Sequence, residues 1–205
     1  MSHTDVLADT AHKADAVTKN DAVHSELCRQ LAELSEKEMS ASTQELAARF
    51  GVSEYQLVAA LPEEMAVMAH GSWAQSLLEE LTGWGSLTTI VESEGSIFEF
   101  KGAFPTGKPG HGYFNLYSKE GTGLHGHLLL SQVSHIALLA KPFMGKASYS
   151  LQFFAANGRT MFKVYLGRDK QRQLLPEQVA QFEQLRARLI AQPQPAAGSR
   201  VIVLA

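Results

Sequence analysis

The spacing of apolar residues predicts helices in the first part of the chain and strands in the second. Between residues 25 and 83, apolar side chains recur at intervals of three and four, the period of a helix with one buried face. Four helices are expected there, at residues 25–34, 42–50, 53–61 and 73–81. Either Ser42 or Thr43 can cap the second helix, and Ser53 can cap the third. Pro176 opens a fifth helix, whose apolar residues lie on one face.

From residue 84 onward the helical period gives way to short runs of β-branched, aromatic and aliphatic residues, each bounded by Gly, Pro, Asn or Ser. Seven strands are expected, at residues 87–91, 96–100, 112–117, 126–130, 135–139, 149–154 and 161–166. Asn157-Gly158 is a strong hairpin signal between the last two. Because this spacing leaves no room for crossover helices, the sheet should be mainly antiparallel. The expected fold class is α+β, with an N-terminal helical block, an antiparallel sheet of about seven strands and a C-terminal helix.

These patterns divide the chain into four parts. Residues 1–24 have little apolar periodicity and are expected to form a flexible extension. Residues 25–83 should form the helical part, and residues 84–191 the sheet with its closing helix. Residues 192–205 are a tail rich in Pro, Ala and Gly.

Composition limits the possible classes of function. The net charge of −3 gives no electrostatic footprint for binding nucleic acid or an anionic membrane. The single cysteine, Cys28, cannot form an internal disulfide or a thiolate metal centre within one chain, and no role in function is expected for it. No apolar run is long enough to span a membrane, and the N-terminus lacks the features of a signal peptide. A cytoplasmic location is therefore expected.

Residues 43–61 have the layout of a helix-turn-helix, with Gly51 at the tight turn. A DNA-reading protein needs basic and amide side chains on the second helix of this motif. That helix, from Ser53 to Leu61, contains no Lys or Arg. The motif is therefore interpreted as a packing unit.

Four histidines fall in the region of the predicted strands, namely His111, His125, His127 and His135. His125 and His127 are two residues apart, so on a strand both side chains point to the same face. Such a pair can chelate zinc, copper or iron, but no third ligand is evident by spacing. His135, in a Leu-rich run, is interpreted as a structural histidine.

The segment at residues 110–116, GHGYFNL, is more informative. Glycines on both sides of His111 indicate backbone that turns sharply or approaches a ligand closely, although they can equally mark a bulge. An assembly of large apolar residues is expected nearby, consisting of Phe98, Phe100, Phe104, Tyr113, Phe114, Phe143 and Met144. Such an assembly is either ordinary core or the wall of a cleft for a large flat ligand. Lys163 and Arg168 could bind a ligand carboxylate or simply cap the sheet, and no catalytic motif is found.

Taken together, an ordered set of motifs resembles the HutX/ChuX family of haem-utilisation proteins. The set lies at residues 84–89, 98–102, 112–116, 126–127, 135–138, 142–145 and 162–169. The resemblance implies a helical N-terminal part on an antiparallel sheet, similar to one half of the larger HemS/ChuS haem proteins. Because those proteins carry two such halves in tandem, the resemblance also implies a homodimer.

The function implied by the resemblance is that of an intracellular haem carrier, which takes up imported haem and passes it to a haem-degrading enzyme. The alternative is a haem-degrading enzyme in its own right. Position by position, the resemblance makes Tyr113 and His127 the candidate iron ligands, and tyrosinate is a hard donor suited to ferric haem. The other candidate haem contacts are Phe114, Phe100, Lys101, Met144 and Arg168. No nucleic-acid or membrane partner is implied.

The chain departs from the family pattern in two places. Some family members carry a histidine where this chain has Glu92. The loop at residues 121–126 is about two residues longer than usual and adds His125. Either His125 or His127 can therefore occupy the family's position, and His111 is a further candidate.

Overall fold

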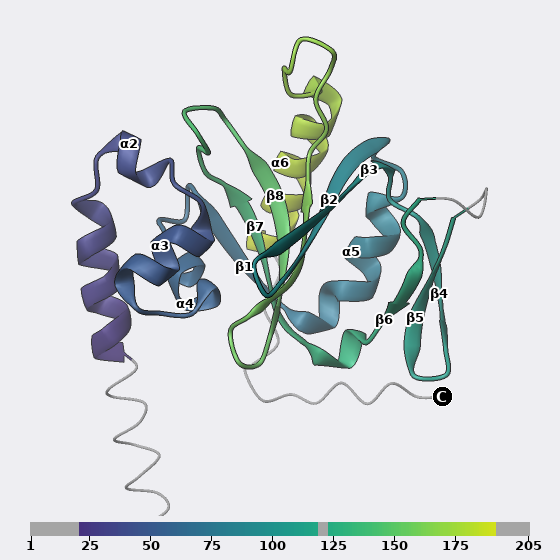
Figure 1. Cartoon of the computed structure of the whole chain (residues 1–205), viewed down its shortest axis with the longest axis horizontal. Helices are drawn as coiled ribbons and strands as arrows, with labels where there is room; N and C mark the ends of the chain where they lie inside the picture. The colour runs from purple at the N-terminus through teal and green to yellow at the C-terminus, as the bar shows by residue number, and fades with distance from the viewer. Residues whose placement is uncertain (1–20, 119–122, 192–205) are drawn as a thin grey trace, which may run out of the picture.

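The computed structural model describes residues 21–118 and 123–191 (Figure 1). Most of the expected extension, the tail at residues 192–205, and residues 121 and 122 of the longer loop lie outside the described residues. Helices form the N-terminal part, the strands are antiparallel, and one helix closes the chain, so the predicted α+β class is confirmed. Within these described ranges, no helix is both long and apolar enough to cross a membrane.

The N-terminal helical part consists of a helix at residues 21–32, α2 (Glu36–Met39), α3 (Thr43–Phe50) and α4 (Glu54–Ala59). The last three each begin with a capping box, formed by Ser35 with Glu38, Ser42 with Glu45, and Ser53 with Gln56. The predicted caps at Ser42 and Ser53 are thus confirmed, whereas the short α2 was not predicted. Gly51 ends α3 with a φ of 66°, a left-handed conformation that favours glycine. A short 3-10 turn, η1 (Gly71–Trp73), leads into α5 (Ala74–Leu81).

The strands form two antiparallel sheets, one of six strands and one of three. The six-stranded sheet has the order β1 (Ala66–His70), β7 (Val133–Ala140), β8 (Tyr149–Ala155), β9 (Thr160–Tyr165), β2 (Ser86–Ser93) and β3 (Ser96–Ala103). The three-stranded sheet has the order β4 (Thr106–Gly110), β5 (Tyr113–Tyr117) and β6 (Gly126–Leu128). All seven predicted strands are present, and the sequence missed β1 and β4. The predicted hairpin at Asn157-Gly158 joins β8 to β9, with Gly158 at a φ of 77°.

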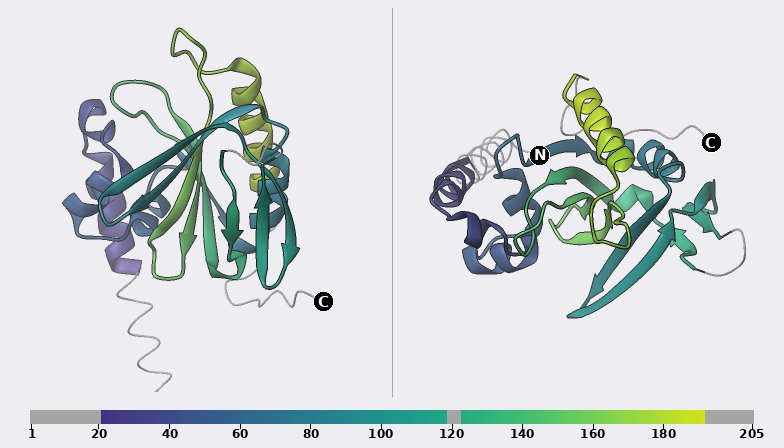
Figure 2. Two further views of the ribbon diagram at one scale, coloured as in Figure 1. Left: turned by 45° about the vertical axis from the view of Figure 1, so that its right-hand side comes forward. Right: turned by 90° about the horizontal axis from the view of Figure 1, so that it is seen from above.

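The six-stranded sheet has a core on each face. On one side, α5 and α6 (Pro176–Ala191) pack against it, with Leu78, Phe153 and Phe182 fully buried. On the other side, the N-terminal helices cover β1, β7 and β8 through residues such as Leu57 and Phe154. Figure 2 shows the two layers of helices on opposite sides of the strands. The three-stranded sheet adds one of its own faces to the first core, so it is held against α5 (Figure 1).

Candidate ligand-binding face

The three-stranded sheet turns one face inward and the other outward. Along β5, Phe114 and Leu116 are buried in the core, while Tyr113 and Tyr117 alternate with them and are 43% and 54% exposed. Asn115 lies between the two tyrosines on the same outer face, since side chains of a strand alternate between its faces. Pairing with β4 places the exposed Lys108 opposite Asn115. We call this surface the outer face of the three-stranded sheet.

The two glycines around His111 form the turn between β4 and β5. His111 has a φ of 53° and Gly112 a φ of 81°. Positive φ at both central positions is typical of the tight two-residue turn that joins antiparallel strands. The predicted sharp turn is therefore confirmed, and it leaves His111 exposed at the tip of the hairpin.

Strand β6 brings His127 onto the outer face. It pairs with β5 so that His127 stands opposite Asn115, and the His127 Nδ1 atom lies 2.6 Å from Asn115 Oδ1. The His127 ring also packs edge-on against Tyr113, with ring centroids 5.9 Å apart. His125 lies just before β6, and its Nδ1 is 2.9 Å from the carbonyl oxygen of Gly123 in its own loop. Of the two neighbouring histidines, His127 is the one beside Tyr113.

The outer face thus combines groups suited to one kind of ligand. A tyrosine phenol is a hard oxygen donor for ferric iron, and imidazole is a common ligand of iron. The second tyrosine, Tyr117, adds a flat apolar ring, and Lys108 adds a cation that can meet a carboxylate. These residue types fit a flat, iron-bearing ligand with acidic side groups. Within residues 21–118 and 123–191, no three His, Cys, Asp or Glu side chains gather as a bare metal ion requires.

The expected assembly of large apolar residues is divided among four places, one of them the outer face with Tyr113, so these residues do not form a single wall within the chain. Phe104 and Phe114 are buried in the core, each 3% exposed. Phe98, which is 53% exposed, and Phe100 lie on β3, an edge strand of the other sheet. Phe143 and Met144 lie on the loop between β7 and β8. Strand assembly decided these positions, because β3 is an edge strand of the six-stranded sheet, β5 belongs to the three-stranded sheet, and Phe143 and Met144 lie between strands.

Lys101, another predicted contact, also lies on β3. Its side chain is 72% exposed and its Nζ is 3.4 Å from a carboxylate oxygen of Glu99. In register, Lys101 stands opposite Thr88, and Phe100 opposite the buried Thr89. Phe100 and Lys101 therefore face opposite sides of the six-stranded sheet.

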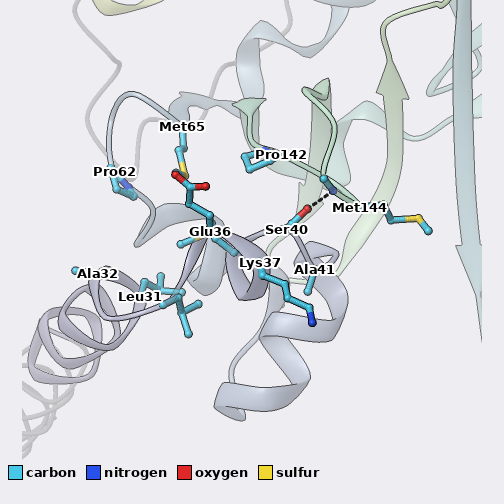
Figure 3. Close-up of a pocket in the computed structure, with 13 residues that line it drawn as sticks. Leu31, Ala32, Glu36, Lys37, Ser40, Ala41, Pro62, Met65, Pro142 and Met144 are labelled. Carbon is cyan, nitrogen blue, oxygen red and sulfur yellow. Dashed lines mark hydrogen bonds between the residues drawn. The ribbon is translucent and has the colours of Figure 1, made fainter. Parts of the chain in front are cut away.

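The β7–β8 loop, which carries Met144, lies on the opposite side of the molecule from β5 and meets the end of α2 (Figures 1 and 2). The N–H of Met144 donates to the carbonyl oxygen of Ser40 at 2.9 Å, and the N–H of Gly145 donates to Ser40 Oγ at 2.5 Å. A mainly apolar groove of about 1110 Å³ lies here, between this loop and the N-terminal helices. Its lining includes Leu31, Met39, Met65 and Pro142. In Figure 3 the Met144 side chain, which is 78% exposed, points away from the groove.

The two basic residues around β9 both bond to other groups of the chain, Arg168 at the surface and Lys163 in the interior. Arg168 donates to the carbonyl oxygens of Ala147 at 2.6 Å and Arg172 at 3.0 Å, so its guanidinium ties two loops together. Lys163 is only 3% exposed, and its Nζ lies 2.7 Å from Glu54 and 3.1 Å from Glu92. Lys163 therefore cannot reach a ligand carboxylate, and that interpretation is wrong. The physical reason is that β9 lies inside the six-stranded sheet, under the N-terminal helices.

Two threonines also contact this buried ion pair. The hydroxyls of Thr43 and Thr160 both donate to the Glu54 carboxylate. Burial acts to lower the pKa of Lys163, but the Glu54 carboxylate, together with Tyr165 and Glu92, outweighs it and raises that pKa. Glu92, at the position where some family members have histidine, is therefore used for an internal ion pair.

His135 is likewise structural, since its half-buried ring stacks on Tyr55 at a centroid distance of 4.2 Å.

Comparison with known proteins adds sequence evidence. A family model described as haem utilisation ChuX/HutX matches residues 67–185. The intracellular heme transport protein HutX of Vibrio cholerae is 46% identical over 178 residues, which make up 87% of this chain and 92% of that protein. The solved structure of the heme binding protein ChuX is 33% identical and superposes with a TM-score of 0.72, covering 80% of this chain and 99% of that one.

A more distant likeness concerns the fold alone. The heme degrading enzyme ChuS of Escherichia coli O157:H7 is 19% identical, with a TM-score of 0.61. The match covers 80% of this chain but only 47% of ChuS. The predicted similarity to one half of a larger protein is therefore confirmed at the level of the fold.

Proposed function

The chain belongs to the ChuX/HutX family of haem-utilisation proteins, and on this premise we propose that it binds haem and carries it as cargo inside the cell. Its relative HutX is named an intracellular heme transport protein, and ChuX a heme binding protein. The single observation from this chain that supports the proposal is the pairing of Tyr113 with His127 on the exposed outer face. Both side chains can bond iron, and both are open to a ligand.

Tyr113 is the proposed iron ligand, as a phenolate, with His127 in a supporting role. The two rings are in edge contact at a centroid distance of 5.9 Å, so no porphyrin plane fits between them in this conformation. Both side chains therefore lie on the same side of a bound haem. Only one of them can bond the iron from that side, and the phenolate is the harder donor for the ferric state.

Five further residues are proposed to contact the haem or to support its site. Phe114 packs behind Tyr113 in the core and would support β5 rather than contact haem. Phe100 and Lys101 lie on the exposed β3, where a ligand or a second chain can reach them. For Met144 and Arg168 the proposal depends on the family resemblance alone, because Met144 lies on the β7–β8 loop and Arg168 is bound to backbone carbonyls.

The acting form is proposed to be a homodimer. Edge strand β3 carries Ile97 and Phe98, which are 62% and 53% exposed. Proteins rarely leave an apolar edge strand open, because it can pair with other chains. A second copy covering β3 would bury both side chains. Light scattering should therefore show a dimer, and Phe98→Glu should shift it toward the monomer; a wild-type monomer at micromolar concentration would contradict the proposal.

An absorbance titration of the full chain with hemin tests the central proposal. We expect a saturable shift of the Soret band, with one site for each chain. A linear, unsaturated change would indicate only non-specific association with apolar surface. Such a result would refute the carrier function.

The fate of the haem is a separate proposal, in which this chain hands intact haem to a haem-degrading enzyme. Mixing the haem complex with a haem-free acceptor enzyme should transfer the Soret signal faster than haem dissociates into a passive scavenger. The alternative, degradation by this chain itself, is tested by adding reductant and oxygen to the complex and analysing the products. Intact haem supports a carrier, and an opened macrocycle supports an enzyme.

A further inference from the structure

We propose that Asn115 is a positioning residue, which holds the His127 ring as its Nδ1–H tautomer and so leaves the Nε2 lone pair available to the ligand. The inference rests on the proposed haem site, since it concerns how that site is prepared. It starts from the hydrogen bond between His127 Nδ1 and Asn115 Oδ1, at 2.6 Å. Which atom donates in that bond follows from the surroundings of Asn115.

The orientation of the Asn115 amide is decided by backbone carbonyl groups. Its Nδ2 atom donates to the carbonyl oxygens of Gly110 at 3.0 Å, Lys108 at 3.2 Å and Tyr113 at 3.4 Å. Carbonyl oxygens only accept hydrogen bonds, so the NH₂ group must lie on their side. The opposite orientation would set the amide oxygen against three other oxygens. The Asn115 oxygen therefore faces His127.

The tautomer of His127 follows directly. An amide oxygen only accepts, so His127 Nδ1 must carry the proton that it donates. In the neutral ring, Nε2 then has no proton and presents a lone pair. A histidine oriented in this way by a partner on its second nitrogen is the usual arrangement at metal sites in proteins.

A glycine makes room for the Asn115 amide. A Cβ atom built on Gly110 would lie 3.1 Å from Asn115 Nδ2, which is tighter than ordinary contact. Gly110 pairs with Tyr113 at the end of the hairpin, so the amide lies close over this backbone. The glycine that precedes His111 therefore has a second use besides the turn. It lets Asn115 reach the carbonyl groups that orient it.

The consequence for the haem site depends on the lone pair. Beside Tyr113, an unprotonated Nε2 can accept the proton that the phenol must lose when its oxygen bonds ferric iron, or can bond the iron itself. The Nε2–H tautomer can do neither. Asn115 thus prepares His127 before the ligand arrives.

Long-range ¹H–¹⁵N NMR of the full chain without haem tests the inference, because the two nitrogens of each neutral histidine ring report which one is protonated. Two other histidines serve as internal references. His125 Nδ1 faces the carbonyl oxygen of Gly123 at 2.9 Å, so it should also be the Nδ1–H form. His70 Nδ1 accepts from the N–H of Ser72 at 3.2 Å, so it should be the Nε2–H form. We expect His127 to match His125, and a match to His70 would overturn the inference.

One substitution removes the acceptor. Asn115→Leu deletes the oxygen, and the tautomer ratio of His127 should move toward Nε2–H by at least about fivefold, the size expected for one hydrogen bond. Unchanged signals from His125 and His70 would show that the variant is folded. An unchanged ratio in this variant would refute the inference.

Two more measurements connect the tautomer to the ligand. Gly110→Ala displaces the amide without altering Asn115, and should change the His127 tautomer less than Asn115→Leu does. In the ferric haem complex, Asn115→Leu should alter the spectrum while His125→Ala leaves it unchanged. If the wild-type chain has the Nδ1–H tautomer but does not bind hemin, the proposed function fails and the role of Asn115 stands. If hemin binds and His127 is the Nε2–H form, the reverse holds.

Discussion

Two groups of polar side chains lie on or against the strands of this protein, and they differ in whether their hydrogen-bonding groups and charges are paired within the chain. Beneath the N-terminal helices, Lys163 is bonded to Glu54 and Glu92, and the Glu54 carboxylate also accepts from two threonines. On the outer face of the three-stranded sheet, Tyr113 and His127 are exposed. There, Asn115 orients the His127 ring.

The difference follows from position in the sheet. Charges on an inner strand are removed from water and must be paired, which costs desolvation but fixes how the helices sit on the sheet. Side chains on an outer face remain hydrated and can exchange water for a ligand. The first group should therefore govern stability and the second group binding. Substitutions that affect one property and spare the other test this comparison.

The largest effect is expected from breaking the buried ion pair. Glu54→Gln should lower the free energy of unfolding by about 3 kcal/mol, the low end for a buried charge left without its main partner, because Glu92 remains beside Lys163. Chemical denaturation measures this. The control is Glu94→Gln, because Glu94 pairs with Arg159 at the exposed surface and its loss should cost less than about 1 kcal/mol. Equal losses in both variants would contradict the comparison.

Lys141 should make stability depend on pH in the same region. It is 4% exposed, its Nζ donates to the carbonyl oxygens of Ala41 and Pro142, and burial lowers its pKa to about 8 although Glu45 acts to raise it. Above pH 8 the folded chain has lost this proton while the unfolded chain keeps it up to its ordinary value near 10.5. The unfolded state then binds more protons, so stability rises with pH, by up to about 3 kcal/mol across that window.

Denaturation at several pH values between 8 and 10 measures this rise. It should be absent in Lys141→Met and present in Lys146→Met, which alters an exposed lysine of the same loop. The range stops at pH 10 because burial raises the pKa of Tyr55 and Tyr165, whose effect on stability has the opposite sign. A rise that persists in Lys141→Met would assign it to another group.

On the outer face, Tyr113→Phe should leave stability nearly unchanged and alter haem binding. The ring is retained and the position is 43% exposed, so the free energy of unfolding should change by less than about 0.5 kcal/mol. Loss of the phenolate should abolish the tyrosinate charge-transfer band of the ferric complex. Affinity should fall at least tenfold, about 1.4 kcal/mol.

The matched control is Tyr117→Phe, on the same face and 54% exposed, which should bind haem like the wild type. His127→Ala should have a smaller spectral effect than Tyr113→Phe. An unchanged spectrum in Tyr113→Phe together with a large change in His127→Ala would reverse the assignment of the iron ligand.

The smallest effect is expected at Cys28, which belongs to neither group. It is partly buried on the helix at residues 21–32, and its Sγ lies 3.6 Å from His24 Nε2. Cys28→Ser should lower the free energy of unfolding by less than about 1 kcal/mol and leave haem affinity unchanged. A loss of affinity on this substitution would show that the thiol contributes to the site.

Local sequence patterns determined most of the elements. The capping residues Ser42 and Ser53, the Asn157-Gly158 turn and the alternation of Tyr113 with Phe114 each depend on interactions within a few residues. The two missed strands lack such signals. Strand β4 contains Gly107 and Pro109, residue types that weaken a strand, and it is tolerated as an edge strand paired only with β5. A Cβ on Gly107 would lie 2.2 Å from the Phe114 ring, so that glycine is required by packing.

By itself, then, the sequence determined the α+β class, the family, and Tyr113 and His127 as candidates. The tertiary structure decided which polar groups meet. It placed Lys163 between Glu54 and Glu92 and set His127 rather than His125 beside Tyr113. It also put Met144 on the β7–β8 loop, on another part of the molecule from Tyr113 and His127. These outcomes depend on strand order and register between segments distant in the chain, and a shift of one residue moves every side chain to the other face. Local periodicity predicts on which face of a strand a side chain lies. Which other side chains it contacts depends on how the strands assemble into the sheet.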